Sequence, residues 1–184
     1  DKERIIKFLE FDKSMNLFAL GDIINYDIDH DILDVYLDNE LDFKVVYTIY
    51  RKHLVISAKK GTRIDKEFIK QLSENGKIVD YNGDGDLIDT CILEGFKKRK
   101  CYLLSLKEVV ELDSYEGVEV GKKESIEEFV KSTYQVFTDT TMDFSSYYDE
   151  LDKGVKKIYF IKEDNKIVSG CTTTAENKYS AMIV

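Results

Sequence analysis

The order of helical and strand-forming segments repeats along this chain of 184 residues, and the repeat constrains the fold more than any other feature. In the first copy, residues 2–11 and 14–26 carry apolar side chains at helical spacing. Three runs rich in β-branched and aromatic residues follow at 33–38, 43–50 and 53–59, separated by short polar turns. Strands joined by such short turns predict an antiparallel meander.

The same order returns about 124 residues later. Residues 125–137 and 144–153 have helical spacing, and residues 156–184 contain three further strand-forming runs. We therefore predict an α+β (mixed α/β) fold made of two tandem modules, residues 1–106 and 107–184. Each module is expected to pack its helices on a mostly antiparallel mixed sheet.

Only the first copy continues beyond its third strand. There we expect a helix over about 65–76, a strand at 77–81, a short helix at 86–95 and a strand at 100–106. The second copy has no such continuation, and the sequence stops in the apolar run YSAMIV. By the arithmetic of the repeat, the second module is expected to be incomplete, with roughly 50 residues still to follow.

Polar residues at the starts of the helical segments predict N-terminal caps. Ser14 and Asp65 each precede a helical segment, and Ser125 forms a predicted capping box with Glu128. Gly76 is typical of a helix C-terminus, because glycine adopts the left-handed conformation without steric cost.

Composition excludes several classes of protein. The formal net charge of −9 and the pI of about 4.9 argue against binding to nucleic acid or to an anionic membrane surface, since both require a basic face. No apolar run is long enough for a membrane span. The cysteines, at positions 91, 101 and 171, lack metal-site spacing and are predicted to be buried free thiols in a reducing compartment, the cytoplasm.

An antiparallel meander followed by a helical crossover to a parallel strand is the element order of the GNAT superfamily of N-acetyltransferases. The segment IYFIKEDNKIVSGCTTTAENKYSAMIV, residues 158–184, resembles the second to fourth strands of these enzymes. SMNLFALGDI, residues 14–23, resembles the early helix of a clostridial-type subgroup in which a degenerate GNAT-like module precedes a catalytic one. The resemblance implies direct attack of a small-molecule or peptide amine on the thioester of acetyl-CoA.

The family holds the pyrophosphate of acetyl-CoA on a glycine-rich turn, preceded by Arg or Gln, that opens the helix after the fourth strand. The equivalent stretch of the first module, AKKGTRID at 58–65, has a single glycine and different spacing. We therefore expect the first module not to hold the cofactor in the family's manner. In the second module the turn would lie beyond this sequence, and Met182, Ile183 and Val184 are implied to pair with the pantetheine arm.

The residues that carry the chemistry are not fixed by the resemblance. The catalytic acid is commonly a tyrosine on the last helix of the fold, which lies outside this sequence. Asp139, Asp143 and Glu176 are equivalent candidates for the base that accepts the amine proton, and solvated turn carboxylates are the alternative interpretation. Tyr147 and Tyr148 are implied to line the acceptor pocket, with packing on a helix face as the alternative.

Two acidic clusters resemble cation sites but fail the ligand requirements. Residues 80–87, DYNGDGDL, match the start of a calcium loop, but Cys91 stands where a bidentate glutamate is needed. Asp27, Asp29, His30 and Asp31 lie between a helix and a strand, where polar residues are expected anyway. We predict no metal at either place.

A second class of function remains open from the sequence. The two modules could form a non-catalytic domain that binds a small molecule or dimerises. The apolar segment 179–184 is an expected site of self-association, so a homodimer is compatible with either function.

Overall fold

The structure, a computed structural model, forms two compact units, residues 1–105 and 106–184. Each unit has a sheet and core residues of its own. The residues that the structure describes are 2–28, 30–104, 117–134, 144–178 and 181–183.

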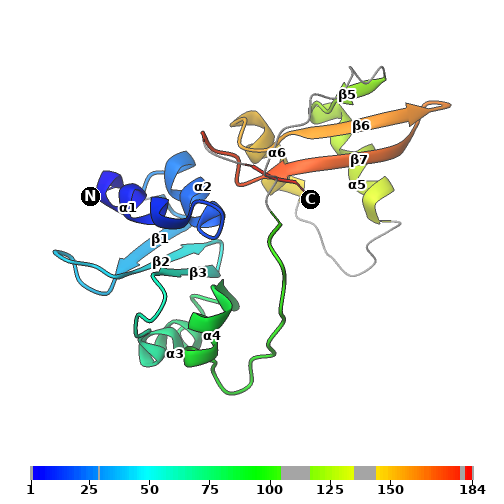
Figure 1. Ribbon diagram of the computed structural model, residues 1–184. Helices are drawn as coiled ribbons and strands as arrows, with labels where there is room; N and C mark the ends of the chain where they lie inside the picture. Colours follow the sequence, from blue (N-terminus) through cyan, green and yellow to red (C-terminus); the bar gives the residue numbers. More distant parts are fainter. Residues whose placement is uncertain (1, 29, 105–116, 135–143, 179–180, 184) are drawn as a thin grey trace. The chain divides into compact units, whose positions relative to one another are not determined.

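A four-stranded sheet forms the centre of unit 1 (Figure 1). Strands β1 (Leu33–Leu37), β2 (Val45–Tyr50) and β3 (His53–Ala58) form the predicted antiparallel meander. Strand β4 (Asp80–Gly83) pairs with β3 in parallel, which gives the spatial order β1-β2-β3-β4.

Helices cover both faces of this sheet. The first face carries α1 (Lys2–Leu9), the short 3-10 helix η1 (Glu10–Asp12) and α2 (Leu17–Asn25). The second face carries α3 (Lys66–Glu74) and α4 (Gly85–Cys91), as Figure 1 shows.

Alternate residues of β2 and β3 enter two separate cores. Val46 and Val55 pack against α1 and α2, whereas Tyr47 and Ile56 pack against α3 and α4. Because both faces are covered, β2 is apolar or aromatic at every position except Thr48. Helix α3 connects β3 to the parallel strand β4, as a parallel connection requires.

Gly83 permits the close approach of β4 to β3. A Cβ atom at this position would lie 2.7 Å from the carbonyl oxygen of Ile56, which is a backbone atom and has no rotamer to escape into. Glycine is therefore required where this parallel ladder ends and the chain turns into α4.

Unit 2 repeats the arrangement of two helices followed by a meander. Its elements are β5 (Val118–Val120), η2 (Lys123–Ser125), α5 (Ile126–Tyr134), α6 (Phe144–Asp152), β6 (Ile158–Glu163), β7 (Lys166–Thr174) and β8 (Met182–Ile183). The sheet order is β5-β6-β7-β8, and all neighbours are antiparallel. Ile126, Phe129 and Val130 of α5 pack on Ile158 and Phe160 of β6.

The β6–β7 hairpin turns at Asp164 and Asn165. Their φ angles are +49° and +61°, so both central residues of the turn are left-handed. This is the geometry of a type I′ turn, whose twist matches that of the flanking strands.

The α+β fold class is confirmed, with corrections to individual elements. Residues 100–104 form no strand, and Tyr102 and Leu104 are exposed. The prediction of a strand from the apolar residues at this place is therefore wrong for 100–104. Strand β5 was missed because VEV is only three residues long. Within the described ranges, no helix is long and apolar enough to cross a bilayer.

Two predicted caps are wrong. Ser14 lies in a turn, and Asn16 precedes α2 with its side-chain amide donating to the carbonyl oxygen of Leu9 at 2.8 Å. Ser125 belongs to the 3-10 turn that leads directly into α5. Glu128, the predicted partner of Ser125, instead accepts a hydrogen bond from Lys162 on β6 at 2.7 Å.

The cysteine prediction holds for one residue of three. All three are free thiols, but Cys91 alone is fully buried, whereas Cys101 is exposed and Cys171 half-buried.

Candidate functional site

A hollow in the described part of unit 1 lies beside the N-terminus of α3 and has a cavity volume of about 990 Å³. It is formed by the loop after β3, the first turns of α3 and one side of α4. Its lining residues are Lys60, Gly61, Thr62, Arg63, Ile64, Asp65, Lys66, Glu67, Lys70, Asp86, Leu87 and Thr90. The hollow includes most of the stretch 58–65 that the sequence equates with the cofactor loop.

A second, smaller hollow of about 120 Å³ shares Lys60 and Leu87 with the first. It lies where β3 and β4 stop pairing, since Ile56 and Gly83 are the last partners of the ladder, whereas Ala58 is paired with β2 alone. The two hollows therefore adjoin at the end of the parallel strand pair.

Asp65 organises the rim of the large hollow, because it is the N-cap of α3 as predicted. One of its carboxylate oxygens accepts hydrogen bonds from the amides of Glu67 at 3.0 Å and Phe68 at 3.1 Å. The amide of Asp65 itself donates to the hydroxyl of Tyr47 at 3.3 Å. The first free amides of the helix are thus occupied by a carboxylate of the same chain.

Most charges around the hollow are paired. Lys60 lies 2.7 Å from Asp86, which lowers the pKa of the Asp86 carboxyl and raises that of the Lys60 ammonium through their hydrogen bond. Lys70 lies 3.8 Å from Glu67 and from Glu74. Both sets of partners are exposed, so these pairs contribute little to stability.

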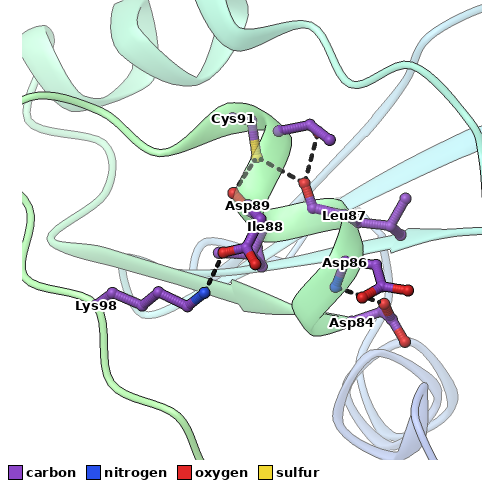
Figure 2. A network of polar contacts seen from close by, with 8 residues as sticks. Asp84, Asp86, Leu87, Ile88, Asp89, Cys91 and Lys98 are labelled. Carbon is purple, nitrogen blue, oxygen red and sulfur yellow. Dashed lines mark hydrogen bonds and ion pairs between the residues drawn. The ribbon is translucent and has the colours of Figure 1, made fainter.

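Helix α4 forms the opposite side of the hollow, and Figure 2 shows the contacts that hold it. Asp84 caps this helix by accepting from the amide of Asp86 at 2.9 Å, and Lys98 forms an ion pair with Asp89. The thiol of Cys91 points back along the helix and lies 3.6 Å from the carbonyl oxygens of Leu87 and Ile88. Burial raises the pKa of Cys91, so this thiol is a packing group and a poor nucleophile.

Tyr47 lies in the core and its hydroxyl accepts a hydrogen bond from Asp65 at the rim of the hollow. Its burial makes the stability of the fold depend on pH. Burial raises the pKa of Tyr47 to about 12, whereas a free tyrosine has a pKa of about 10. Between these values the unfolded chain loses the proton and the folded chain keeps it, so stability is intact below pH 10 and falls as pH approaches 12. We expect the variant Tyr47→Phe to lose stability less steeply over this window in thermal melts.

At neutral pH the same variant should be about 1 kcal/mol less stable, because the hydroxyl that accepts from Asp65 is gone. Equal slopes for the two proteins between pH 10 and 12 would contradict the assignment to Tyr47.

Of the predicted substrate and base residues of unit 2, the structure describes the side chains of Tyr148 and Glu176. Tyr148 on α6 is half-buried and packs on the core of unit 2, with the ammonium of Lys123 5.3 Å from its ring centre. This matches the packing alternative for Tyr148. Tyr147 lies on the same helix, and its side chain is outside the described set, as are Asp139 and Asp143.

Glu176 is engaged by neighbours. Its carboxylate forms an ion pair with Lys157 and accepts from the hydroxyl of Thr173 at 3.1 Å. This hydrogen-bonded ion pair raises the pKa of the Lys157 ammonium. These two contacts give Glu176 a structural role at the end of β7.

Two of the residues predicted to contact the cofactor, Met182 and Ile183, form the edge strand β8. Met182 and Ile183 pair with Thr174 and Thr173 of β7, and Ile183 is 71% exposed. Val184 lies outside the described residues. The backbone on the far side of β8 has no strand partner in the described part of the chain.

The residues of the calcium-like motif have other roles. Asp80 lies in β4, 2.9 Å from the imidazole of His53, while Asp84 caps α4 and Asp86 binds Lys60. His30, from the other acidic cluster, accepts from the amide of Ile32. Nowhere in the described ranges do three or more His, Cys, Asp or Glu side chains converge as metal ligands would.

Sequence reasoning missed the hollow itself. It identified the loop at 58–65 but had no means of showing that α4 lies opposite and leaves space between. The mixture of cations and anions in KKGTRIDKE, residues 59–67, was the available signal that this loop carries a polar site. Comparison with family models, curated proteins and solved structures gives no match to this chain.

Proposed function

We propose that the chain belongs to a GNAT-type N-acetyltransferase, with residues 107–184 in the catalytic module and residues 1–106 forming a degenerate companion module. The reaction is transfer of the acetyl group of acetyl-CoA to an amine of a small molecule or peptide. Three free thiols are compatible with the cytoplasm, where this proposal places the protein.

The observation that carries the proposal is the element order of unit 2. The resemblance assigned the strands within 158–184 as the second to fourth of the family fold, so a first strand should precede the two helices. Strand β5 occupies that position and pairs with β6 at the edge of the sheet. A strand that was not predicted thus fits the order that the family requires.

Unit 1 supports the same proposal from the other part of the fold. Its meander is followed by a helix and a parallel strand, which is the second half of the family's element order. The two units together therefore contain each part of that order at least once.

The proposed chemistry needs three contributions from the protein: a strand that holds the pantetheine arm, a site that orients the amine, and a base. The outer backbone edge of Met182 and Ile183 is our candidate for the first. Tyr147 remains our candidate for the acceptor pocket, and Tyr148 would contribute only through its exposed edge. The base stays unassigned among Asp139, Asp143 and Glu176.

Titration of the 184-residue chain with acetyl-CoA tests this proposal. We expect calorimetry to show weak binding at most and no turnover, because neither unit contains the glycine-rich turn. In nuclear magnetic resonance spectra, any amide shifts should appear at Met182 and Ile183. Amides of Glu67 and Phe68 in unit 1 serve as the internal control and should not shift.

A tight, stoichiometric isotherm accompanied by shifts at Glu67 and Phe68 would show that unit 1 is the binding module. That result would reverse the proposed roles of the two units.

The hollow of unit 1 favours a second candidate, a non-catalytic domain that binds a small molecule. A cavity of about 990 Å³ is large enough for a metabolite, and it adjoins a smaller hollow beside Ile56 and Leu87. Saturable amide shifts around Thr62 and Thr90 with a small metabolite, without shifts in β8, would favour this candidate.

A further inference from the structure

We propose that residues 97–104 form a docking segment through which unit 1 binds an anionic lipid surface. The segment reads KKRKCYLL, four consecutive cations followed by Cys101 and three large side chains with apolar surface. All eight residues are exposed and lie outside helices and strands. The proposal goes beyond the transferase function, since it concerns where the protein is held and not what it catalyses.

The first argument concerns charge. Lys98 forms an ion pair with Asp89 of α4 (Figure 2), whereas Lys97, Arg99 and Lys100 have no ion pair among the residues that the structure describes. The net charge of −9 argues against an anionic surface only for the chain taken as a whole. Screening limits that repulsion to a Debye length of about 8 Å at physiological ionic strength, so the charges nearest the surface decide. Each Lys or Arg near an anionic leaflet strengthens binding about five-fold.

The second argument is the exposure of apolar side chains beside these cations. Tyr102 is 79% exposed, Leu103 40% and Leu104 91%. At a lipid interface, aromatic and aliphatic side chains are buried at the level of the headgroups while neighbouring cations contact the anionic groups. The phosphates of a nucleic acid would engage the cations but would leave both leucines in water. The combination therefore favours a lipid surface.

The third argument is the attachment of the segment to unit 1. Phe96, the residue before the segment, packs on the core, and the centres of its ring and the ring of Tyr81 are 5.2 Å apart. The amide of Phe96 donates to the carbonyl oxygen of Leu93, a buried residue, at 3.3 Å. The segment thus leaves the fold from an anchored point, so a surface that binds it holds unit 1 as well.

Co-sedimentation of the 184-residue chain with large unilamellar vesicles tests the proposal. Equimolar phosphatidylserine and phosphatidylcholine make the anionic vesicles, and phosphatidylcholine alone makes the neutral reference. The variant Lys97→Gln/Lys100→Gln removes two cations from the segment. Lys7→Gln/Lys59→Gln is the matched control, because both lysines are exposed in unit 1 and the change in net charge is the same.

We expect the chain to bind the anionic vesicles and not the neutral ones, with binding weakened by salt. Lys97→Gln/Lys100→Gln should weaken binding about 25-fold, and the control pair less than about two-fold. A third variant, Tyr102→Ser/Leu104→Ser, should weaken binding about ten-fold at low and at high salt, because apolar burial is not screened. All these side chains are exposed, so no substitution removes a core contact.

Absence of binding to the anionic vesicles would overturn the proposal. An equal loss in the control pair would also overturn it, because bulk charge would then explain the attraction. A single-stranded oligonucleotide is titrated in parallel. Binding of this probe that depends on Lys97 and Lys100 but not on Tyr102 and Leu104, without vesicle binding, would replace the lipid surface by a nucleic acid.

Discussion

Replacement of Leu54 by alanine is expected to lower the free energy of unfolding of unit 1 by about 2–5 kcal/mol. Leu54 lies in β3, is fully buried and belongs to the core between the sheet and helices α3 and α4. Truncation removes three carbon atoms from this core, and the neighbours on a paired strand can close the cavity only in part.

Urea titration followed by hydrogen–deuterium exchange of peptides from residues 45–58 measures this loss without interference from unit 2. Leu41→Ala is the matched control, because Leu41 is 86% exposed and its truncation leaves no cavity. A loss below about 1 kcal/mol at Leu54 would mean that this face of the sheet is not packed as described.

Replacement of Gly170 by valine is expected to destabilise unit 2 by about 3 kcal/mol. A Cβ atom at Gly170 would lie 2.7 Å from the ring of Phe129 and 2.9 Å from the carbonyl oxygen of Tyr159. The ring could move only by opening the core under α5, and the carbonyl belongs to the backbone of the neighbouring strand β6. Both contacts must be relieved at once, which makes the substitution costly.

Ser169→Val provides the control on the same strand, since Ser169 is exposed and adding apolar atoms there meets no core residue. Exchange of peptides from residues 158–174 in increasing urea distinguishes the two variants. Similar stabilities would contradict the contact between β7 and α5.

The regular parts of the fold were accessible from the sequence because their signals are local. In the three meander strands of unit 1, successive side chains enter two apolar cores in turn, and polar turns mark the ends of the strands. The cap at Asp65 follows from an equally local rule, the preference of aspartate for the position before a helix. Each of these predictions required only a few consecutive residues.

The errors arose where tertiary contacts decide the outcome. Glu128 could pair with Ser125 or reach across to β6, and only the fold brings Lys162 within 2.7 Å. The apolar run at 102–104 has strand-like composition but no strand partner among the described residues. The hollow of unit 1 depends on where α4 packs, which no window of sequence reveals.

The candidate site was predictable in part. The sequence identified the loop at 58–65 and its departure from the glycine-rich pattern. The structure shows that Asp65 of this loop caps α3 at the rim of the hollow. Of the residues proposed for unit 2, Tyr148 packs on the core and Glu176 forms an ion pair with Lys157, and neither contact could be seen in a short window of sequence.

The helices that cover one face of the unit 1 sheet, α1 and α2, precede the meander in the sequence. The helices that cover the other face, α3 and α4, follow it. During synthesis, α1 and α2 leave the ribosome before the strands, so the first face can be buried as soon as β3 has emerged. The second face waits for α3, β4 and α4, and stays open until translation has passed Leu93. At about 5–20 residues per second, Tyr47, Leu54 and Ile56 remain accessible to chaperones for seconds. Nascent unit 1 is therefore most prone to aggregation in this interval.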